Sequence, residues 1–291
     1  MSFSVRRDQV LVSTAWLADH LDDPGIRVLD CRYYFDRSGR DEYDRGHIPG
    51  AVHLNWAEAL SDPDLPVDFM IAPPAQVASV MGSLGVGAGT LVVAYDDEGG
   101  HYSSRLWLIM ARYGHSAQVR ILEGGWTKWT REGRPVATDV PRVAPASFAV
   151  DLAAGRPDLV ASLDDVLAAH RTGSARLLDV RRRSEYTGEE VRARRGGRIP
   201  GATHLLWQGN LNWDADRTLA PEATIRARHE AAGLSPDTPI ITYCQGGVRA
   251  AHAALALWIA GYRNVRVYDG SWAEWGNRDD TPIEAGEPAG A

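Results

Sequence analysis

The stretch Pro239-Ile240-Ile241-Thr242-Tyr243-Cys244-Gln245-Gly246-Gly247-Val248-Arg249 decides the fold. Its first part, residues 240–243, is a largely apolar run of the kind that a buried parallel strand requires. Residues 250–260 are rich in Ala and Leu and predict a helix. The glycine pair between the two runs permits a tight turn. This strand–turn–helix order predicts an α/β fold with a mostly parallel sheet flanked by helices.

The same pattern occurs once earlier in the chain. Residues 91–96 precede a glycine pair and a long apolar stretch, and they match residues 239–244. Three further pairs follow in the same order: residues 28–32 with 177–181, 46–54 with 197–205, and 122–126 with 268–272. All offsets fall between 146 and 151 residues. A period this long does not suit a solenoid and indicates two tandem copies of one globular domain.

The repeat also predicts the domain boundaries. We expect a first domain over residues 1–140, a linker over 141–157, a second domain over 158–280 and a mobile tail over 281–291. The linker begins in a stretch rich in Pro and small residues. The tail carries Pro, Gly, Glu and Ala with little apolar content, which is typical of a mobile terminus.

Composition narrows the class of protein. The 291 residues carry a net charge of −7, which argues against a nucleic-acid binder. No apolar run is long enough to span a membrane, and the N-terminus has no apolar signal core. Two cysteines in so long a chain favour a reducing compartment, so we expect a soluble cytoplasmic protein, with a Cys31–Cys244 disulfide as the minor alternative. The His and Cys spacing indicates no zinc site, and no metal or cofactor is expected.

Cys244 is the predicted nucleophile. Ligands of parallel sheets bind beyond the carboxyl ends of the strands, which is where Cys244 stands. The glycines allow backbone N–H groups to point inward, and together with the helix N-terminus they favour an anion such as a thiolate. The predicted binding loop for an anionic substrate comprises Gln245, Gly246, Gly247, Val248 and Arg249, whose guanidinium adds a positive charge. The alternative is a small buried structural thiol.

The first copy provides an internal comparison. Asp96 stands where the second copy has Cys244. A carboxylate cannot perform thiolate chemistry, so we expect the first domain to be catalytically inactive and to form one wall of the cleft. Cys31 corresponds to the apolar Val180, and we interpret it as a structural residue.

Together these segments resemble the tandem-domain rhodanese family of sulfurtransferases. The resemblance runs from Val10 to Asn277 and rests on the strand–Cys–loop–helix segment, the Asp-x-Arg strand ends, Gly-His-Ile-Pro-Gly-Ala, Gly-Gly-Trp and Gly-Ser-Trp. It implies two tandem rhodanese-like domains, the first inactive and the second catalytic. It also implies ping-pong catalysis, in which Cys244 accepts a sulfane sulfur as a persulfide and passes it to cyanide or a thiol. Phosphatases with a similar loop have five residues between Cys and Arg; four separate Cys244 from Arg249, which favours sulfur over phosphate.

The resemblance leaves two donors open, thiosulfate and 3-mercaptopyruvate. Mercaptopyruvate enzymes carry a hydroxyl residue where this chain has Gly246, a His where it has Phe69, and an Arg where it has Glu185. These three departures favour thiosulfate. Thiosulfate enzymes often have a basic residue directly after the Cys, however, and Gln245 fits neither type.

An arginine-rich segment suggests the partners. Its members are Arg181, Arg182, Arg183, Arg192, Arg194, Arg195 and Arg198. They could attract a small anionic sulfur donor or an acidic protein acceptor, and the latter defines a further hypothesis, a persulfide carrier that works with a partner protein. The interleaved glutamates favour a solvated surface instead, except for Arg181, whose Asp-x-Arg setting predicts a structural ion pair. No nucleic acid or membrane is expected among the partners.

Overall fold

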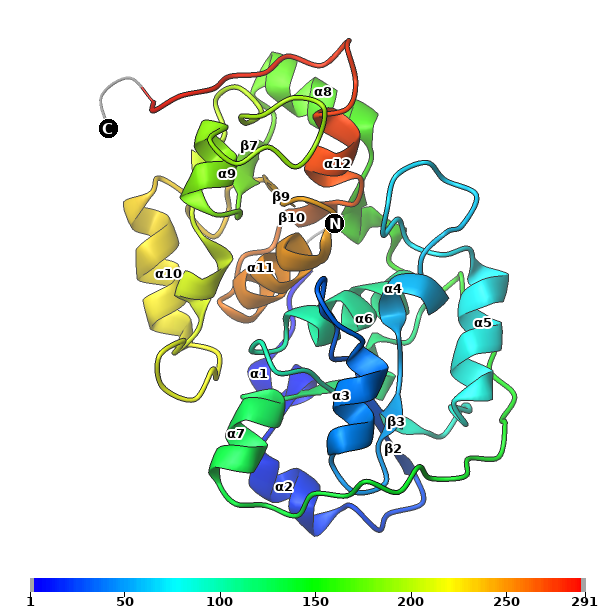
Figure 1. The fold of residues 1–291 in the computed structure, drawn as a ribbon. Coiled ribbons are helices and arrows are strands. Elements are labelled where there is room, and N and C mark those ends of the chain that lie inside the picture. Colours follow the sequence, from blue (N-terminus) through cyan, green and yellow to red (C-terminus); the bar gives the residue numbers. More distant parts are fainter. Residues whose placement is uncertain (1–2, 289–291) are drawn as a thin grey trace.

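The computed structural model describes residues 3–288. Each half of the chain forms one five-stranded sheet flanked by helices, with strand orders β1-β5-β4-β2-β3 and β6-β10-β9-β7-β8 (Figure 1). Every strand pair is parallel. The prediction of two α/β domains built on one repeated topology is confirmed.

The strands of the two sheets correspond one to one. The first sheet contains β1 (Leu11–Val12), β2 (Ile26–Asp30), β3 (Val52–His53), β4 (Leu91–Tyr95) and β5 (Val119–Leu122). The second contains β6 (Val160–Ala161), β7 (Arg176–Asp179), β8 (Thr203–His204), β9 (Ile240–Tyr243) and β10 (Val265–Tyr268). The central strands β4 and β9 are buried along almost their whole length, as their apolar sequences require.

The helices follow the same repeat. Those of the first half are α1 (Arg7–Val10), α2 (Thr14–Asp19), α3 (Gly39–Arg45), α4 (Trp56–Ala59), α5 (Pro74–Ser83), α6 (His101–Arg112), the 3-10 turn η1 (Ser116–Gln118) and α7 (Gly125–Arg131). Those of the second are η2 (Pro157–Leu159), α8 (Leu163–Thr172), α9 (Arg183–Thr187), η3 (Trp207–Asn210), α10 (Glu222–Ala231), α11 (Val248–Ile259) and α12 (Ser271–Trp275).

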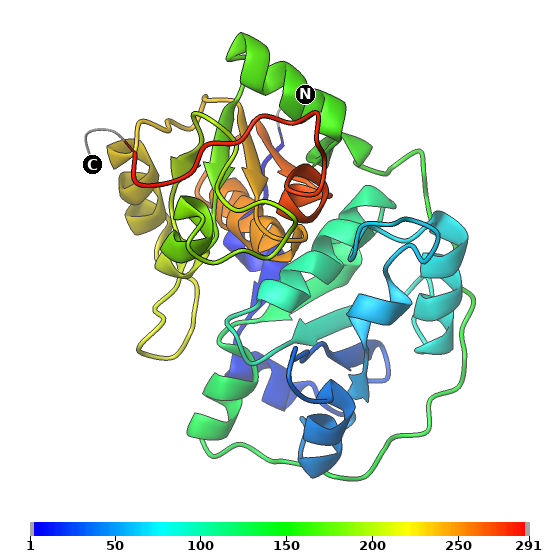
Figure 2. The ribbon, with the colours of Figure 1, turned by 45° about the horizontal axis from the view of Figure 1, so that its top comes forward.

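Helices α6 and α11 form the centre of the domain interface and lie against each other in both ribbon views (Figures 1 and 2). Nearly all residues of both helices are buried, as expected for helices that are packed on all sides. Trp107 of α6 and Trp258 of α11 pack with ring centroids 5.8 Å apart. Because α6 follows β4 and α11 follows β9, the loop that precedes each helix also lies at this interface.

The linker and the tail both pack against a domain. The linker runs along the outside of the first domain (Figure 1), where Ala146 N donates to Gly82 O at 2.9 Å and Asp151 N to Tyr113 O at 3.0 Å. In the second domain Arg198 and Glu284 exchange backbone hydrogen bonds of 2.8 and 3.0 Å. The packed chain therefore continues past residue 280. Mobility of the tail stays a prediction, and its last three residues, 289–291, lie outside the described part.

Across residues 3–288, the structure has no helix whose length and apolar character would suffice to cross a membrane.

Candidate active site

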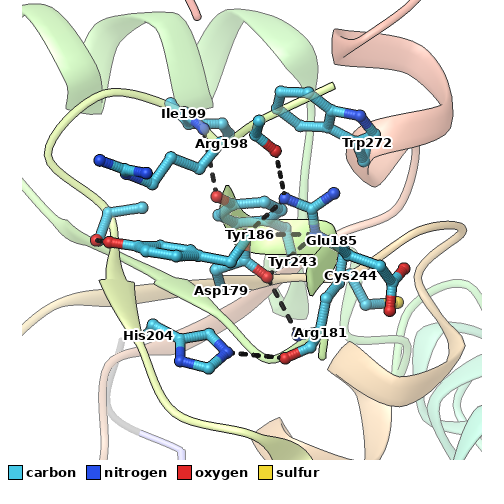
Figure 3. Close-up of polar contacts among 12 residues, drawn as sticks. Asp179, Arg181, Glu185, Tyr186, Arg198, Ile199, His204, Tyr243, Cys244 and Trp272 are labelled. Atoms are coloured by element: carbon cyan, nitrogen blue, oxygen red, sulfur yellow. Dashed lines mark hydrogen bonds and ion pairs between the residues drawn. The ribbon is translucent and has the colours of Figure 1, made fainter. Parts of the chain in front are cut away.

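A buried ion pair lies behind the loop that contains Cys244 (Figure 3). Arg181 Nη2 lies 2.6 Å from Asp179 Oδ2 and also donates to Gly197 O at 2.7 Å. The guanidinium stacks over Trp272, 4.5 Å from the ring centroid. The predicted structural ion pair of Arg181 is thus confirmed, and it ties the end of β7 to the neighbouring loops. Asp30 and Arg32 repeat the pair in the first domain.

Ser271 holds the Cys244 loop from the adjacent strand end. Its Oγ accepts hydrogen bonds from Cys244 N and Gly247 N, both at 3.1 Å, and donates to Tyr268 O at 2.8 Å. One hydroxyl therefore joins the two ends of the turn to β10. Sequence reasoning missed this role, although the repeated Gly-Ser-Trp segment pointed to the position.

Both glycines of the loop are needed because neighbouring atoms lie too close to leave room for a Cβ. Gly247 has φ +75°, and a Cβ there would lie 2.8 Å from Asp269 O. A Cβ at Gly246 would lie 2.9 Å from Phe69 Cδ2, which comes from the first domain. Phe69 is itself held over the loop, because its carbonyl accepts from Arg105 and Arg105 Nη1 lies 2.6 Å from Asp269 Oδ1.

The loop of the first domain encloses its own anion. The carboxylate of Asp96 accepts from Glu98 N at 2.9 Å, Gly100 N at 2.8 Å and Ser103 N at 2.9 Å. Burial raises the pKa of Asp96, while the bonds from these amides oppose the rise. The backbone amides of this loop type therefore converge on one anionic side chain. At the equivalent place in the second domain stands Cys244, which is 1% exposed.

A cavity of about 440 Å³ opens on Cys244 at the domain interface. The first domain contributes an aromatic wall that consists of Phe35, Trp56, Phe69 and Tyr102. The second domain contributes Arg182, Arg192 and Arg249 together with the Cys244 loop. The cavity thus combines an apolar side with a cationic side. The expectation that the first domain forms one wall of the cleft agrees with this arrangement.

Glu185 organises the cationic side. Its carboxylate accepts from Arg249 Nη1 at 2.7 Å and Nη2 at 2.9 Å. Arg182 Nε lies 3.4 Å and Arg192 Nη1 3.6 Å from the same carboxylate. Burial opposes the charge of Glu185, but the hydrogen bonds from Arg249 prevail and lower its pKa to about 2. Sequence reasoning treated Glu185 as standing in place of an arginine and as one of the glutamates of a solvated surface. It is instead 1% exposed, and its pairing with Arg249 was not foreseen.

The predicted loop residues do not all face the cavity. Cys244, Gln245, Gly246, Val248 and Arg249 line it, whereas Gly247 is not part of the lining and serves the turn. The Gln245 amide donates to Arg192 O at 2.8 Å, so this side chain is turned toward the arginine-rich segment. The cationic charge of Arg249 is present as predicted, but Glu185 neutralises much of it.

Three further expectations from the sequence can be compared with the structure. Both cysteines are free thiols, so the minor alternative of a Cys31–Cys244 disulfide is not realised. Burial raises the pKa of Cys31 well above its usual value, in keeping with a structural thiol. The interpretation of the arginine-rich segment as solvated surface is wrong for Arg198, which is 1% exposed and stacks over Tyr186 at 4.4 Å.

Fold and site together define a two-domain α/β protein with the Cys244 loop at its domain interface. The chain belongs to the rhodanese family of sulfurtransferases, since the family model described as Rhodanese-like domain matches residues 13–132 and 162–278. The two matches correspond to the two repeats seen in the sequence.

Named relatives cover almost the whole chain. The sulfur carrier protein TtuD of Thermus thermophilus is 36% identical over 96% of this chain and 98% of its own. A thiosulfate sulfurtransferase of Corynebacterium glutamicum is 35% identical over 95% of this chain and 91% of its own. The crystal structure of SseA from Escherichia coli, a 3-mercaptopyruvate sulfotransferase, has a TM-score of 0.80 and 33% identity, and the match covers 90% of this chain and 98% of SseA.

Proposed function

We propose that the chain transfers the sulfane sulfur of thiosulfate to cyanide or a thiol through a persulfide on Cys244. The observation that carries this proposal is the position of Cys244 in the lining of the interface cavity, in a loop whose counterpart encloses the Asp96 carboxylate. The Cys244 thiolate attacks the outer sulfur of thiosulfate, the sulfur–sulfur bond breaks, and sulfite leaves with the bonding electron pair. Cyanide then attacks the persulfide, which releases thiocyanate and restores the thiolate.

Backbone amides support the charged sulfur of the intermediate. The first-turn amides of α11 have no partner within the helix, so those of Val248 and Arg249 are available to an anion next to Cys244. In the first domain, amides at the start of α6, those of Gly100 and Ser103, donate to the Asp96 carboxylate. Gln245, Gly246, Gly247, Val248 and Arg249 are therefore proposed as the substrate-binding loop, with Gly247 acting through the shape of the turn.

Thiosulfate is favoured over 3-mercaptopyruvate by the fit around Gly246. A hydroxyl-bearing residue at this position would meet the ring of Phe69, because even a Cβ would approach Cδ2 to 2.9 Å. The chain thus lacks room for the side chain that mercaptopyruvate enzymes carry there. Overall identity does not separate the two donors, because a relative of each kind is 35% identical to this chain, so the choice rests on the fit around Gly246.

Mercaptopyruvate remains the second candidate donor. A cavity of about 440 Å³ is of the size that holds organic ligands, and Arg182 and Arg192 on its cationic side could receive a carboxylate. The similarity to SseA points in the same direction.

A persulfide carrier is the third candidate, from another functional class. The relative named as a sulfur carrier protein supports it, as does the exposed Phe35 beside Arg192 at the cavity, which a partner protein could contact. An acidic acceptor protein would suit the arginines of the cationic side.

One set of assays separates the three candidates. Steady-state turnover is measured with thiosulfate and with mercaptopyruvate on the same preparation, with cyanide and with a small thiol as acceptors. We expect the higher kcat/KM with thiosulfate; a preference for mercaptopyruvate would reverse the donor assignment. Slow turnover with every small molecule, together with rapid persulfide formation, would favour the carrier.

The role of Cys244 is tested by substitution. Cys244→Ser should abolish turnover and the gain of about 32 Da, one sulfur atom, in the intact mass after exposure to donor. Cys31→Ser is the matched control and should retain both, because Cys31 is buried away from the cavity lining. Undiminished turnover in Cys244→Ser would refute the mechanism.

A further inference from the structure

We propose that Glu98, positioned by His101, is the catalytic base that takes the proton from a thiol acceptor. This inference rests on the proposed function and assigns to the first domain a part in its second half-reaction. Glu98 belongs to the loop that corresponds to the Cys244 loop, and His101 is the first residue of α6, as Val248 is the first residue of α11. The copy without a cysteine in this loop thus supplies an ionisable pair where the other copy has the Cys244 loop.

The two residues share a cavity with Cys244. Glu98, His101 and Cys244 all line it, although they come from different domains. The Glu98 side chain is 42% exposed, so a small molecule in the cavity can reach its carboxylate. The His101 side chain is 7% exposed and is fixed by its neighbours, with ring centroids 3.7 Å from Tyr102 and 4.9 Å from Trp207.

His101 lies where its ring can orient the Glu98 carboxyl group. Its Nδ1 is buried without a hydrogen-bond partner of good geometry in the part of the chain that the structure describes. The nearest acidic atom is Glu98 Oε2, at 3.4 Å. Burial lowers the pKa of His101 well below its usual value, so the ring is neutral at neutral pH. A neutral imidazole can orient the carboxylate without neutralising it.

The surroundings of Glu98 suit a base. Burial raises its pKa, and the carboxylates of Asp97 and Asp96 on the same loop add to the rise. Arg217, from the loop that follows η3, and Arg249 of α11 oppose it. The other charged groups of the cavity, Arg182 and Arg192, lie on the cationic side with Glu185. A carboxylate with a raised pKa is a stronger base than an ordinary one.

The proposed step balances in atoms and charge. Glu98 removes the proton of the acceptor thiol, and the resulting thiolate attacks the outer sulfur of the Cys244 persulfide. The bond between the two persulfide sulfurs breaks, and its electron pair stays on Cys244 as the thiolate. The outer sulfur, now on the acceptor, receives the proton back from Glu98. The products are the acceptor persulfide and the free enzyme, and no oxidant or reductant is consumed.

Cyanide provides a built-in comparison. Cyanide attacks as the ion, which forms when hydrogen cyanide loses its proton to the buffer in bulk solution, so this attack on the persulfide does not need a base in the cavity. Loss of Glu98 should therefore lower turnover with a thiol acceptor far more than turnover with cyanide. The ratio of the two turnover rates on one preparation is independent of the fraction of active protein, and it is the quantity to measure.

The test uses Glu98→Gln in the full chain, with dithiothreitol as the thiol. We expect the thiol-to-cyanide ratio of kcat to fall at least about tenfold, because a positioned base contributes factors of this size or more. The acidic limb of the thiol kcat/KM profile, where activity rises as Glu98 loses its proton, should disappear in the variant. Glu98→Asp should restore part of the ratio, which a merely structural role would not explain.

Asp97→Asn is the matched control, since it removes the adjacent carboxylate, which bonds to Tyr34 and is absent from the cavity lining. The thiol-to-cyanide ratio of kcat in Asp97→Asn should change less than about threefold. A larger effect of Glu98→Gln then cannot come from the loss of one negative charge in this loop alone. An unchanged ratio and an unchanged acidic limb in Glu98→Gln would overturn the inference. If the wild-type protein forms no persulfide on Cys244 from either donor, the proposed function fails instead, and the intact mass distinguishes the two results.

Discussion

Glu185 and Arg249 are joined by two parallel hydrogen bonds of 2.7 and 2.9 Å, which connect α9 to the first turn of α11 beside Cys244. Arg249 is therefore not a free cation that awaits an anionic substrate. Its charge is already paired, and its position is fixed by a carboxylate that is itself fully buried. This pair fixes the first turn of α11 beside Cys244, and it determines the direction in which the stability of the protein should depend on pH.

The stability of the protein should depend on pH through Glu185. Its pKa is lowered to about 2 in the folded protein from an ordinary 4.5, so its ionised form stabilises the fold above about pH 4.5. This contribution is lost as the pH falls from that value toward 2. Glu185→Gln should therefore lower the free energy of unfolding by about 2 kcal/mol at neutral pH and by progressively less in acid.

Urea unfolding of both proteins at several pH values between 3 and 7 measures this difference. Glu58→Gln, at an exposed position, is the control and should show almost no difference at any pH. A deficit in Glu185→Gln that stays constant across the range would contradict the assignment of a lowered pKa.

Gly246→Ser should damage the active site through Phe69. The added Cβ would approach the Phe69 ring to 2.9 Å, and overpacking of this kind typically costs about 1–3 kcal/mol. We expect kcat/KM for thiosulfate to fall about tenfold, and Phe69→Ala in the same chain to recover part of the loss. Gly89→Ser, where a Cβ meets no atom within 4 Å, should be neutral. Full activity of the single variant would show that the loop tolerates the side chain.

Ser271→Ala should weaken the loop without touching its reactive atoms. It leaves the amides of Cys244 and Gly247 without an acceptor in a buried place, at a cost of about 2–3 kcal/mol. Turnover should fall together with stability, as followed by steady-state assays and thermal unfolding. Ser271→Gly suits the φ of +48° at this position but also lacks the hydroxyl. If the glycine variant behaved like wild type, backbone strain and not the hydrogen bonds would be the important factor.

Asp96→Ala should destabilise the first domain by about 3 kcal/mol, because three backbone amides and the Ser103 hydroxyl lose a buried acceptor. Denaturant unfolding measures the effect, with the exposed Asp22→Ala as control. Asp96→Cys combined with Cys244→Ser should remain inactive, since position 96 does not line the cavity. Turnover in that double variant would mean that the first loop is accessible to the donor.

The internal repeat made the fold predictable. Four paired segments in one order led to two parallel α/β domains, and the helix expected over 250–260 is found over Val248–Ile259. The Cys244 loop could be recognised because strand, glycines and helix are consecutive in the chain, and the first domain's Asp96 could be recognised by comparison. Local patterns of this kind can be read from one sequence.

The supporting contacts could not be found in this way. Glu185 meets Arg249 from 64 residues away, and Ser271 meets Cys244 from 27 residues away. Glu98 reaches the cavity from the other domain. No local pattern records such contacts, because they arise only when helices and strands that are remote in the sequence pack together. Glu185 therefore looked like a departure from the family until its partner was visible.

The packing of α6 against α11 has a consequence for any attempt to divide the chain. Trp107 of α6 packs against Trp258 of α11, and aromatic residues of the first domain form one wall of the cavity that opens on Cys244. A cut in the linker that separated the two halves would expose the buried faces of both helices to water and remove that wall. The second domain alone would therefore keep its cysteine but lose the enclosure around it, so the smallest unit that retains the complete cavity is the pair of domains.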